Sequence, residues 1–229
     1  MKKYIWIFLL AVLAIIAICW GWSTLKNPDL FPIRNVEIKA TYLHIDPQDL
    51  QRIIKPFTSS SSFFAVNVKE LKQDLLQLPW VSAVTLQRTW PDTIVIKITE
   101  QVPLAHWNNN SFLAPDMKIF TPKKATVMDD LPKLFGPEAQ TEKVWQYYQQ
   151  MNQIISTLGL NVSEIYLSNS GGWSVLLNND IKVYLGNTDI MQKLQLFIQT
   201  YPKVIAAKVK QVESVDLRYD RGLAVKWKS

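Results

Sequence analysis

The feature that most constrains this chain is an uncharged stretch at residues 4–25, in which most side chains are aliphatic or aromatic: YIWIFLLAVLAIIAICWGWSTL. An α-helix rises about 1.5 Å per residue, so roughly 20 apolar residues cross a hydrocarbon core of about 30 Å. Tyr4 and Trp6 stand near one end and Trp20 and Trp22 near the other, where membrane-spanning helices carry interfacial aromatic residues. The stretch therefore predicts a single transmembrane helix.

The flanks of this helix indicate its processing and its orientation. A cleavable signal peptide has an apolar core of about 7–15 residues and small residues at its cleavage site. This run is longer, and its end is the bulky sequence CWGW at residues 19–22. Lys2 and Lys3 precede it without an acidic neighbour, which favours a cytoplasmic N-terminus. We therefore expect a short cytoplasmic end at residues 1–3, a transmembrane helix at residues 4–25 and export of the rest.

The exported part has the composition of folded domains without disulfides. The chain contains one cysteine, so no disulfide can form within it. Its formal net charge of +6 is spread along the sequence, whereas nucleic-acid-binding proteins gather Lys and Arg in one patch or stripe. We therefore expect hydrophobic cores to hold the exported part together, and we expect no nucleic-acid partner.

The first exported region combines strand and helix patterns. Apolar residues with a period of two predict strands at residues 36–40, 81–89 and 94–98. A helix is expected to begin at Asp46-Pro47, and residues 56–62 are expected to form a loop. Asn67 and Glu70 predict the cap of a second helix, which Pro79 is expected to end. The resulting order is β-α-α-β-β, ending near Pro103.

The second exported region combines two helices with short strands. The helices are predicted from a cap at Thr141 to Gly159 and from Asp189 to Pro202. Polar turns separate a small hairpin near residues 107–112 from further strands at residues 165–167, 173–177 and 181–185. A final hairpin is expected from alternating apolar residues at 215–219 and 223–227, joined by a turn at residues 220–222.

The sequence contains no pattern that predicts catalysis. Its two histidines, His44 and His106, fall in different predicted domains, and no metal-ligand, nucleophile or phosphate-loop motif occurs. Asp129 and Asp130 are adjacent in a predicted loop, which favours a solvated surface over a converging carboxylate pair. We therefore expect no enzymatic activity, no cofactor and no metal site.

Three segments resemble one protein family when they are taken together. They are FPIRNVEI at residues 31–38, LPWVSAVTLQRTWPDTIVIKITEQVPLAHW at residues 78–107, and VDLRYDRGLAVKW at residues 215–227. In this order they resemble the FtsQ/DivIB family of bacterial cell-division proteins. The resemblance implies an α+β fold class: one N-terminal transmembrane helix, a periplasmic POTRA domain (β-α-α-β-β) at residues 31–103, and a second mixed α/β domain with a mainly antiparallel sheet at residues 104–229.

The resemblance also implies a function and a location. Members of the family are single-pass proteins of the cell inner membrane, with a cytoplasmic N-terminus and periplasmic domains concentrated at the division septum. They link early and late division proteins as a scaffold of the divisome. Their last strand pairs with FtsB, which comes with FtsL, and their POTRA domain is associated with FtsK. The alternative function is a POTRA-bearing periplasmic component of a secretion or envelope-assembly system.

The same resemblance implies a set of partner-binding residues in the final hairpin. Arg218, Tyr219, Gly222 and Trp227 stand where the family's binding hairpin has the same residue types, and Leu223 and Val225 belong to the strand expected to pair with the partner. Whether Tyr219 and Trp227 are exposed contacts or core residues stays open.

Family members also often carry basic residues just before the tryptophan that is Trp173 here. This chain has Ser170-Gly171-Gly172 in that place. Arg221 and Lys226 replace smaller residues of the familiar pattern and are candidates for supplying the missing charge.

Overall fold

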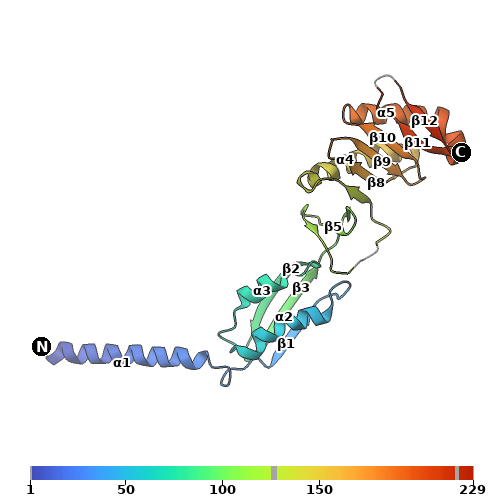
Figure 1. Cartoon of the computed structure of the whole chain (residues 1–229). Coiled ribbons are helices and arrows are strands. Elements are labelled where there is room, and N and C mark those ends of the chain that lie inside the picture. Colours follow the sequence, from blue (N-terminus) through green and yellow to red (C-terminus); the bar gives the residue numbers. More distant parts are fainter. Residues whose placement is uncertain (1, 125–127, 220–221, 229) are drawn as a thin grey trace. The chain divides into compact units, whose positions relative to one another are not determined.

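The structure is a computed structural model that describes residues 2–124, 128–219 and 222–228. The chain forms two compact units, Met1–Gln101 and Val102–Ser229 (Figure 1). Each unit has its own sheet and its own buried core.

The first unit contains three helices and a small sheet. Its elements are α1 (Lys2–Leu25), β1 (Asn35–Lys39), α2 (Pro47–Ser60), α3 (Val68–Leu75), β2 (Val81–Thr89) and β3 (Thr93–Glu100). The strand order is β1-β3-β2, with β1 parallel and β2 antiparallel to the central strand β3. After α1, the predicted order β-α-α-β-β is confirmed.

Helix α1 occupies the stretch that the sequence predicts to cross a membrane. Its described apolar side chains are largely exposed, among them Ile18 and Trp20. Over the part of the chain that the structure describes, no helix is long and apolar enough to span a bilayer. The helix itself is confirmed, and its membrane crossing stays a prediction.

The core of the first unit lies between β3 and the two helices that follow β1. Ile94, Ile96 and Ile98 alternate along β3 and are buried, as their period of two predicts. Leu71 and Leu75 of α3 are fully buried as well. The sheet face predicted from the isoleucines is therefore confirmed.

Two predicted boundaries in this unit are wrong. Residues 56–60, predicted as part of a loop, continue α2 past Pro56. Pro56 lacks the N–H that a residue inside a helix donates, and in the following turn Ser60 Oγ donates to the Pro56 carbonyl oxygen at 2.7 Å. Helix α3 ends at Leu75, before Pro79, because the chain tightens there into a turn in which the Leu78 N–H donates to the Leu75 carbonyl oxygen at 3.2 Å.

The predicted cap of α3 is confirmed, with one difference in its partners. The Glu70 N–H donates to Asn67 Oδ1 at 3.2 Å. The Glu70 carboxylate accepts from the Asn67 side-chain amide at 2.9 Å rather than from the backbone.

A buried carboxylate closes the end of β3 that lies away from α1. Glu100 accepts hydrogen bonds from Thr41 Oγ1 at 2.8 Å and from the N–H groups of Leu43 and His44, each at 2.9 Å. Burial by itself raises the pKa of Glu100, but these hydrogen bonds and the neighbouring His44 outweigh it, so the pKa lies below its ordinary value.

This carboxylate makes the stability of the first unit depend on pH. The pKa of Glu100 is lower in the folded state than in the unfolded state. The Glu100 carboxylate therefore makes its full contribution to the unfolding free energy above the ordinary carboxyl range, near pH 4–5. This contribution is lost as the pH falls through the pKa of Glu100 in the folded state. We expect Glu100→Gln to lower the unfolding free energy at pH 7 and the difference from the parent to shrink toward pH 3. Denaturant titrations at several pH values measure this. Glu37→Gln, at an exposed position of β1, should show a much smaller loss at pH 7.

The second unit is built on one long sheet. Its strands are β4 (Ala105–Trp107), β5 (Ser111–Leu113), β6 (Ile119–Phe120), β7 (Lys133–Phe135), β8 (Val162–Leu167), β9 (Trp173–Leu177), β10 (Lys182–Gly186), β11 (Val212–Asp216) and β12 (Ala224–Trp227). Among the described residues their order is β12-β11-β10-β9-β8-β7-β4-β5-β6. Most neighbouring pairs are antiparallel, while β10–β11, β7–β8 and β4–β7 are parallel.

Two α-helices, α4 (Thr141–Ile155) and α5 (Ile190–Thr200), contact β8 and β10, respectively. Short helical segments complete the unit: η1 (Glu138–Gln140), η2 (Ser156–Leu158), η3 (Tyr201–Ile205) and η4 (Ala206–Gln211). The core is made by fully buried residues that include Met151 of α4, Phe197 of α5 and, in register on adjacent strands, Ile165, Val175 and Val183.

Most of the predicted elements of this unit are confirmed, with three differences. Thr141 is not a cap: the helix begins at this residue, and Thr141 Oγ1 donates to the Glu138 carbonyl oxygen at 2.6 Å. Gly159, with φ of 71°, ends the helical segment as predicted. Helical turns continue beyond Pro202 to Gln211. The strand predicted at residues 215–219 ends at Asp216, which lengthens the connection to β12.

Candidate functional site

The strand β12 lies at the end of the sheet in the second unit. Among the residues that the structure describes, it pairs with β11 on one side only, with Val215 opposite Val225 and Asp216 opposite Ala224. A strand in this position leaves backbone N–H and C=O groups available for pairing with another chain. The strand predicted at residues 223–227 is therefore confirmed over Ala224–Trp227, and it lies at an edge of the sheet.

The direction of the backbone groups shows which of them face the open edge. Along a strand these directions alternate between the two sides. The Lys228 N–H donates to the Gln211 carbonyl oxygen at 2.6 Å, toward β11, and the Leu217 N–H donates to Tyr184 of β10 at 2.8 Å. Counting back along β12 from Lys228, the N–H of Val225 points away from β11. Counting back along β11 from Leu217 gives the same result, because Val215, which lies opposite Val225, directs its N–H toward β10. Val225 therefore offers its backbone donor to the open edge.

The side chains of the predicted site divide between the core and the surface. Leu223 and Val225 are partly buried against the hydrophobic core of the unit. Tyr219 is 60% exposed and Trp227 is 41% exposed. Both aromatic residues are thus available at the surface. Gly222 is partly exposed.

Arg218 marks the start of the connection to β12. Its Nη2 lies 2.6 Å from Asp216 Oδ2, and this hydrogen bond holds the pKa of Asp216 below its usual range. The guanidinium also lies over the Tyr184 ring, 5.5 Å from its centroid. Gly186 lies beside the Arg218 side chain and has a φ of 78°, a backbone conformation that favours glycine. Lys193 Nζ lies beside the same glycine.

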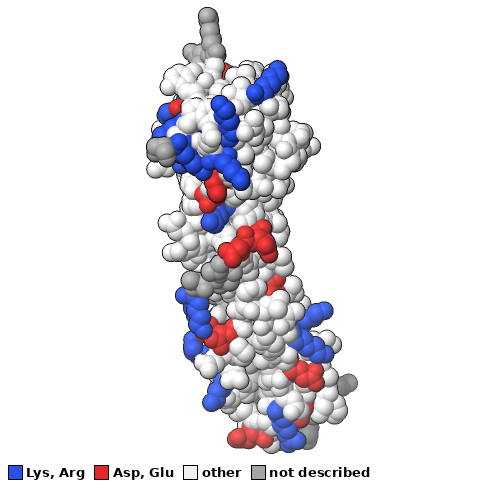
Figure 2. Space-filling view, turned by 90° about the vertical axis from the view of Figure 1, so that its right-hand side faces the viewer, with Lys and Arg blue, Asp and Glu red and all other residues white. Residues whose placement is uncertain are grey.

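Two more cations lie along the edge itself. Lys226 Nζ pairs with Glu213 Oε1 at 2.6 Å, and Lys208 Nζ lies 5.9 Å from the centroid of the Trp227 ring. Figure 2 shows blue Lys and Arg side chains gathered on one face of the second unit, near the top of the view. Arg221, the remaining predicted contact, lies outside the described residues.

The structure adds a cation beside Trp173 that the sequence pattern did not indicate. Ser170-Gly171-Gly172 forms a tight turn, held by Ser168 Oγ, which accepts from the Gly172 N–H at 2.9 Å. Lys143 of α4 lies 5.9 Å from the Trp173 ring centroid. Positive charge therefore reaches Trp173 from a helix thirty residues earlier, not from the preceding turn.

A row of aromatic residues lies on the sheet face opposite the helices. Phe135 of β7 stacks on Tyr166 of β8 at 4.3 Å between centroids, and Lys182 Nζ lies 5.2 Å and 5.3 Å from the ring centroids of Tyr166 and Tyr184. Burial and the neighbouring carboxylate of Glu164 raise the pKa of Tyr166 to about 12. The Tyr166 hydroxyl therefore stays protonated at neutral pH and donates to Glu164.

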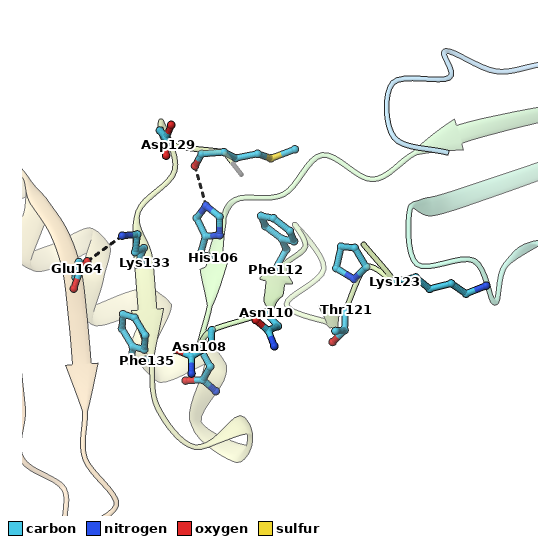
Figure 3. Close-up of a pocket in the computed structure, with 13 residues that line it drawn as sticks. His106, Asn108, Asn110, Phe112, Thr121, Lys123, Asp129, Lys133, Phe135 and Glu164 are labelled. Carbon is cyan, nitrogen blue, oxygen red and sulfur yellow. Dashed lines mark hydrogen bonds and ion pairs between the residues drawn. The ribbon is translucent and has the colours of Figure 1, made fainter. Parts of the chain in front are cut away.

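The second unit also contains a hollow of about 680 Å³, lined in part by His106, Phe112, Lys133 and Glu164 (Figure 3). Two of its polar side chains have partners within the hollow. His106 Nε2 lies 2.8 Å from the Met128 carbonyl oxygen, and Lys133 Nζ lies 3.2 Å from Glu164 Oε1. These two contacts join β4 to the segment that precedes β7, and β7 to β8.

Metal-ligating side chains are not clustered among the residues that the structure describes. No group of three or more His, Cys, Asp or Glu within them is placed to hold a metal ion. His44 and His106 lie in different units, as predicted. The open edge at β12 is therefore the best-formed candidate site.

Comparisons with known proteins match both units of the chain. Residues 31–101 match the family model "POTRA domain, FtsQ-type", and residues 105–218 match "Cell division protein FtsQ/DivIB, C-terminal". The chain is 36% identical to the cell division protein FtsQ of Coxiella burnetii over 96% of this chain and 90% of that protein. It is 31% identical to the protein of the same name from Aliivibrio fischeri (91% and 80%) and 30% identical to that from Escherichia coli (96% and 83%).

Proposed function

The chain belongs to the FtsQ/DivIB family of cell-division proteins, and on this premise we propose that it is a scaffold of the division septum, anchored in the inner membrane by one helix. Residues 1–3 lie in the cytoplasm, residues 4–25 cross the membrane, and a POTRA domain (31–103) and a C-terminal domain (104–229) lie in the periplasm. The protein links early and late division proteins by binding, without catalysing a reaction.

The observation that carries this proposal is the open edge of β12. Strand addition at such an edge supplies affinity through backbone hydrogen bonds and specificity through alternate side chains. We propose that a periplasmic segment of FtsB, in complex with FtsL, adds a strand here. Tyr219 and Trp227 act as exposed aromatic anchors.

Charge supports an acidic partner strand. Lys208, Lys226 and Arg218 lie on or beside the edge, and Lys228 follows the strand. Basic residues on an edge oppose pairing with a second copy of the same edge, while they attract a partner of opposite charge.

The POTRA domain is proposed to contact FtsK.

Localisation tests the overall proposal. A fluorescent fusion of the full chain, expressed in cells depleted of their own FtsQ, should form a band at mid-cell and restore division. A uniform envelope signal in dividing cells, with normal protein levels, would contradict a role at the septum.

The proposed anchor should serve mainly to place the protein in the membrane, and not to contact other membrane helices. Helix α1 contains no GxxxG pattern, which is one of the motifs that favour specific packing between membrane helices. We expect replacement of residues 4–25 by an unrelated single-span helix to retain most of the division activity in a depletion strain. Plating efficiency measures this, and immunoblots of the membrane fraction check protein levels. Loss of growth at normal levels would instead indicate contacts specific to α1.

A further inference from the structure

We propose that the end of the POTRA domain next to α1 dips into the interface of the lipid bilayer, so that the domain has a second membrane contact besides its helix. This inference rests on the membrane anchoring proposed above and goes beyond it, because it assigns a lipid-facing surface to the folded domain. The surface, here called the membrane-proximal tip, is formed by Leu30, Phe31, Phe64 and Trp90.

The backbone holds these residues together at the end of the sheet where β3 begins. The N–H of Arg34, just before β1, donates to the Asp92 carbonyl oxygen at 3.0 Å, which places the β2–β3 turn with Trp90 beside the start of β1. The Phe63 N–H donates to the Phe31 carbonyl oxygen at 2.8 Å. The rings of Phe31 and Phe64 lie edge to face, 5.1 Å apart.

The tip is also bound to the last turn of α1. Ser62 Oγ donates to the Leu25 carbonyl oxygen at 2.8 Å. The chain between helix and tip is short and turned back on itself, because the Phe31 N–H donates to the Asn27 carbonyl oxygen at 3.1 Å. If α1 ends at the membrane surface, the tip therefore lies at the same level.

The membrane-proximal tip exposes large apolar side chains to solvent. Trp90 is 77% exposed, Leu30 59% and Phe64 41%. Large apolar side chains gathered at one exposed place mark an interaction surface. Tryptophan in particular is enriched at the boundary between lipid and water.

The neighbouring side chains fit the head-group region better than a protein partner's core. Lys26 Nζ lies 5.8 Å from the centroid of the Trp22 ring in the last turns of α1. Arg34, with its side chain 73% exposed, reaches out beside Asp92. Aromatic residues flanked by long basic side chains are the usual composition of segments that lie in the bilayer interface, about 5–10 Å deep.

The opposite end of the same sheet provides an internal control. Leu43, whose N–H bonds to Glu100 at the far end of β3, is 74% exposed. The eight residues of β3 separate the two ends by about 23 Å at roughly 3.3 Å per residue. Leu43 and Trp90 are thus equally exposed, but only Trp90 is placed to meet the bilayer.

Site-specific fluorescence of the full chain in vesicles tests the proposal. The vesicles contain phosphatidylethanolamine and phosphatidylglycerol, with or without a lipid that carries a spin label near its head group. Trp90→Cys, Phe64→Cys and Leu43→Cys are each made in a Cys19→Ser background and labelled with an environment-sensitive dye. We expect blue-shifted emission and strong quenching at positions 90 and 64, and neither at position 43.

The unmodified Cys19 separates failure of this inference from failure of the anchoring. With the dye on Cys19, a spin label deep in the acyl chains should quench the emission if α1 crosses the membrane. Quenching at Cys19 together with water-like emission at positions 90 and 64 would overturn the tip contact alone. Absence of quenching at Cys19 would overturn both the anchoring and the tip contact. Unchanged circular dichroism verifies that each variant is folded.

Discussion

Val225→Pro should abolish the proposed capture of the FtsB periplasmic segment while both units of the protein stay folded. The N–H of Val225 points to the open edge of β12, so the substitution removes a donor that the partner strand needs and leaves the β11–β12 pairing in place. A lost backbone hydrogen bond contributes about 1 kcal/mol, and an unsatisfied buried carbonyl on the partner costs about 1–3 kcal/mol more. Together these weaken binding on the order of 30- to 1000-fold.

Titration of a fragment comprising residues 26–229 with the FtsB segment measures this loss. Val225→Ala is the matched control, because it shortens the side chain and keeps the N–H. It should bind within several-fold of the parent. Tyr219→Asp should weaken binding separately, by removing an exposed aromatic anchor and placing a negative charge beside an edge proposed to attract an acidic partner. Parent-like binding by Val225→Pro would rule out strand addition at this edge.

Local patterns predicted those parts of the fold that local interactions decide. The period of two in Ile94, Ile96 and Ile98 predicted a strand with one buried face, and Asn67 with Glu70 predicted a helix start.

The predictions that failed depend on contacts that the local pattern does not contain. Leu217 and Tyr219 continue the alternation of β11, but Asp216 accepts from both the N–H and the side chain of Arg218 and ends the pairing with β12. Likewise, no spacing rule brings Lys143 to the Trp173 ring, because a helix and a strand must first pack together. The roles of the residues at the edge depend on such packing, which explains why the fold was predicted more completely than the site.

Ile96→Ala should destabilise the POTRA domain more than any surface substitution in it. Ile96 is fully buried in the central strand, where Ile38 of β1 and Leu86 of β2 lie opposite it on either side. Removal of three carbons from such a position loses both transfer free energy and packing contacts, at a cost of about 2–5 kcal/mol. For a domain of this size the midpoint of thermal unfolding should fall by at least about 8 °C.

Calorimetry of residues 26–229 measures this effect, and the next residue along the strand supplies the control. Lys97 is exposed on the opposite face of β3, so Lys97→Ala should shift the midpoint by little. The loss should be confined to the first unit, because each unit has its own core; the transition of the second unit should stay where it is. An unchanged first transition in Ile96→Ala would mean that the isoleucine face of β3 does not carry the stability of this domain.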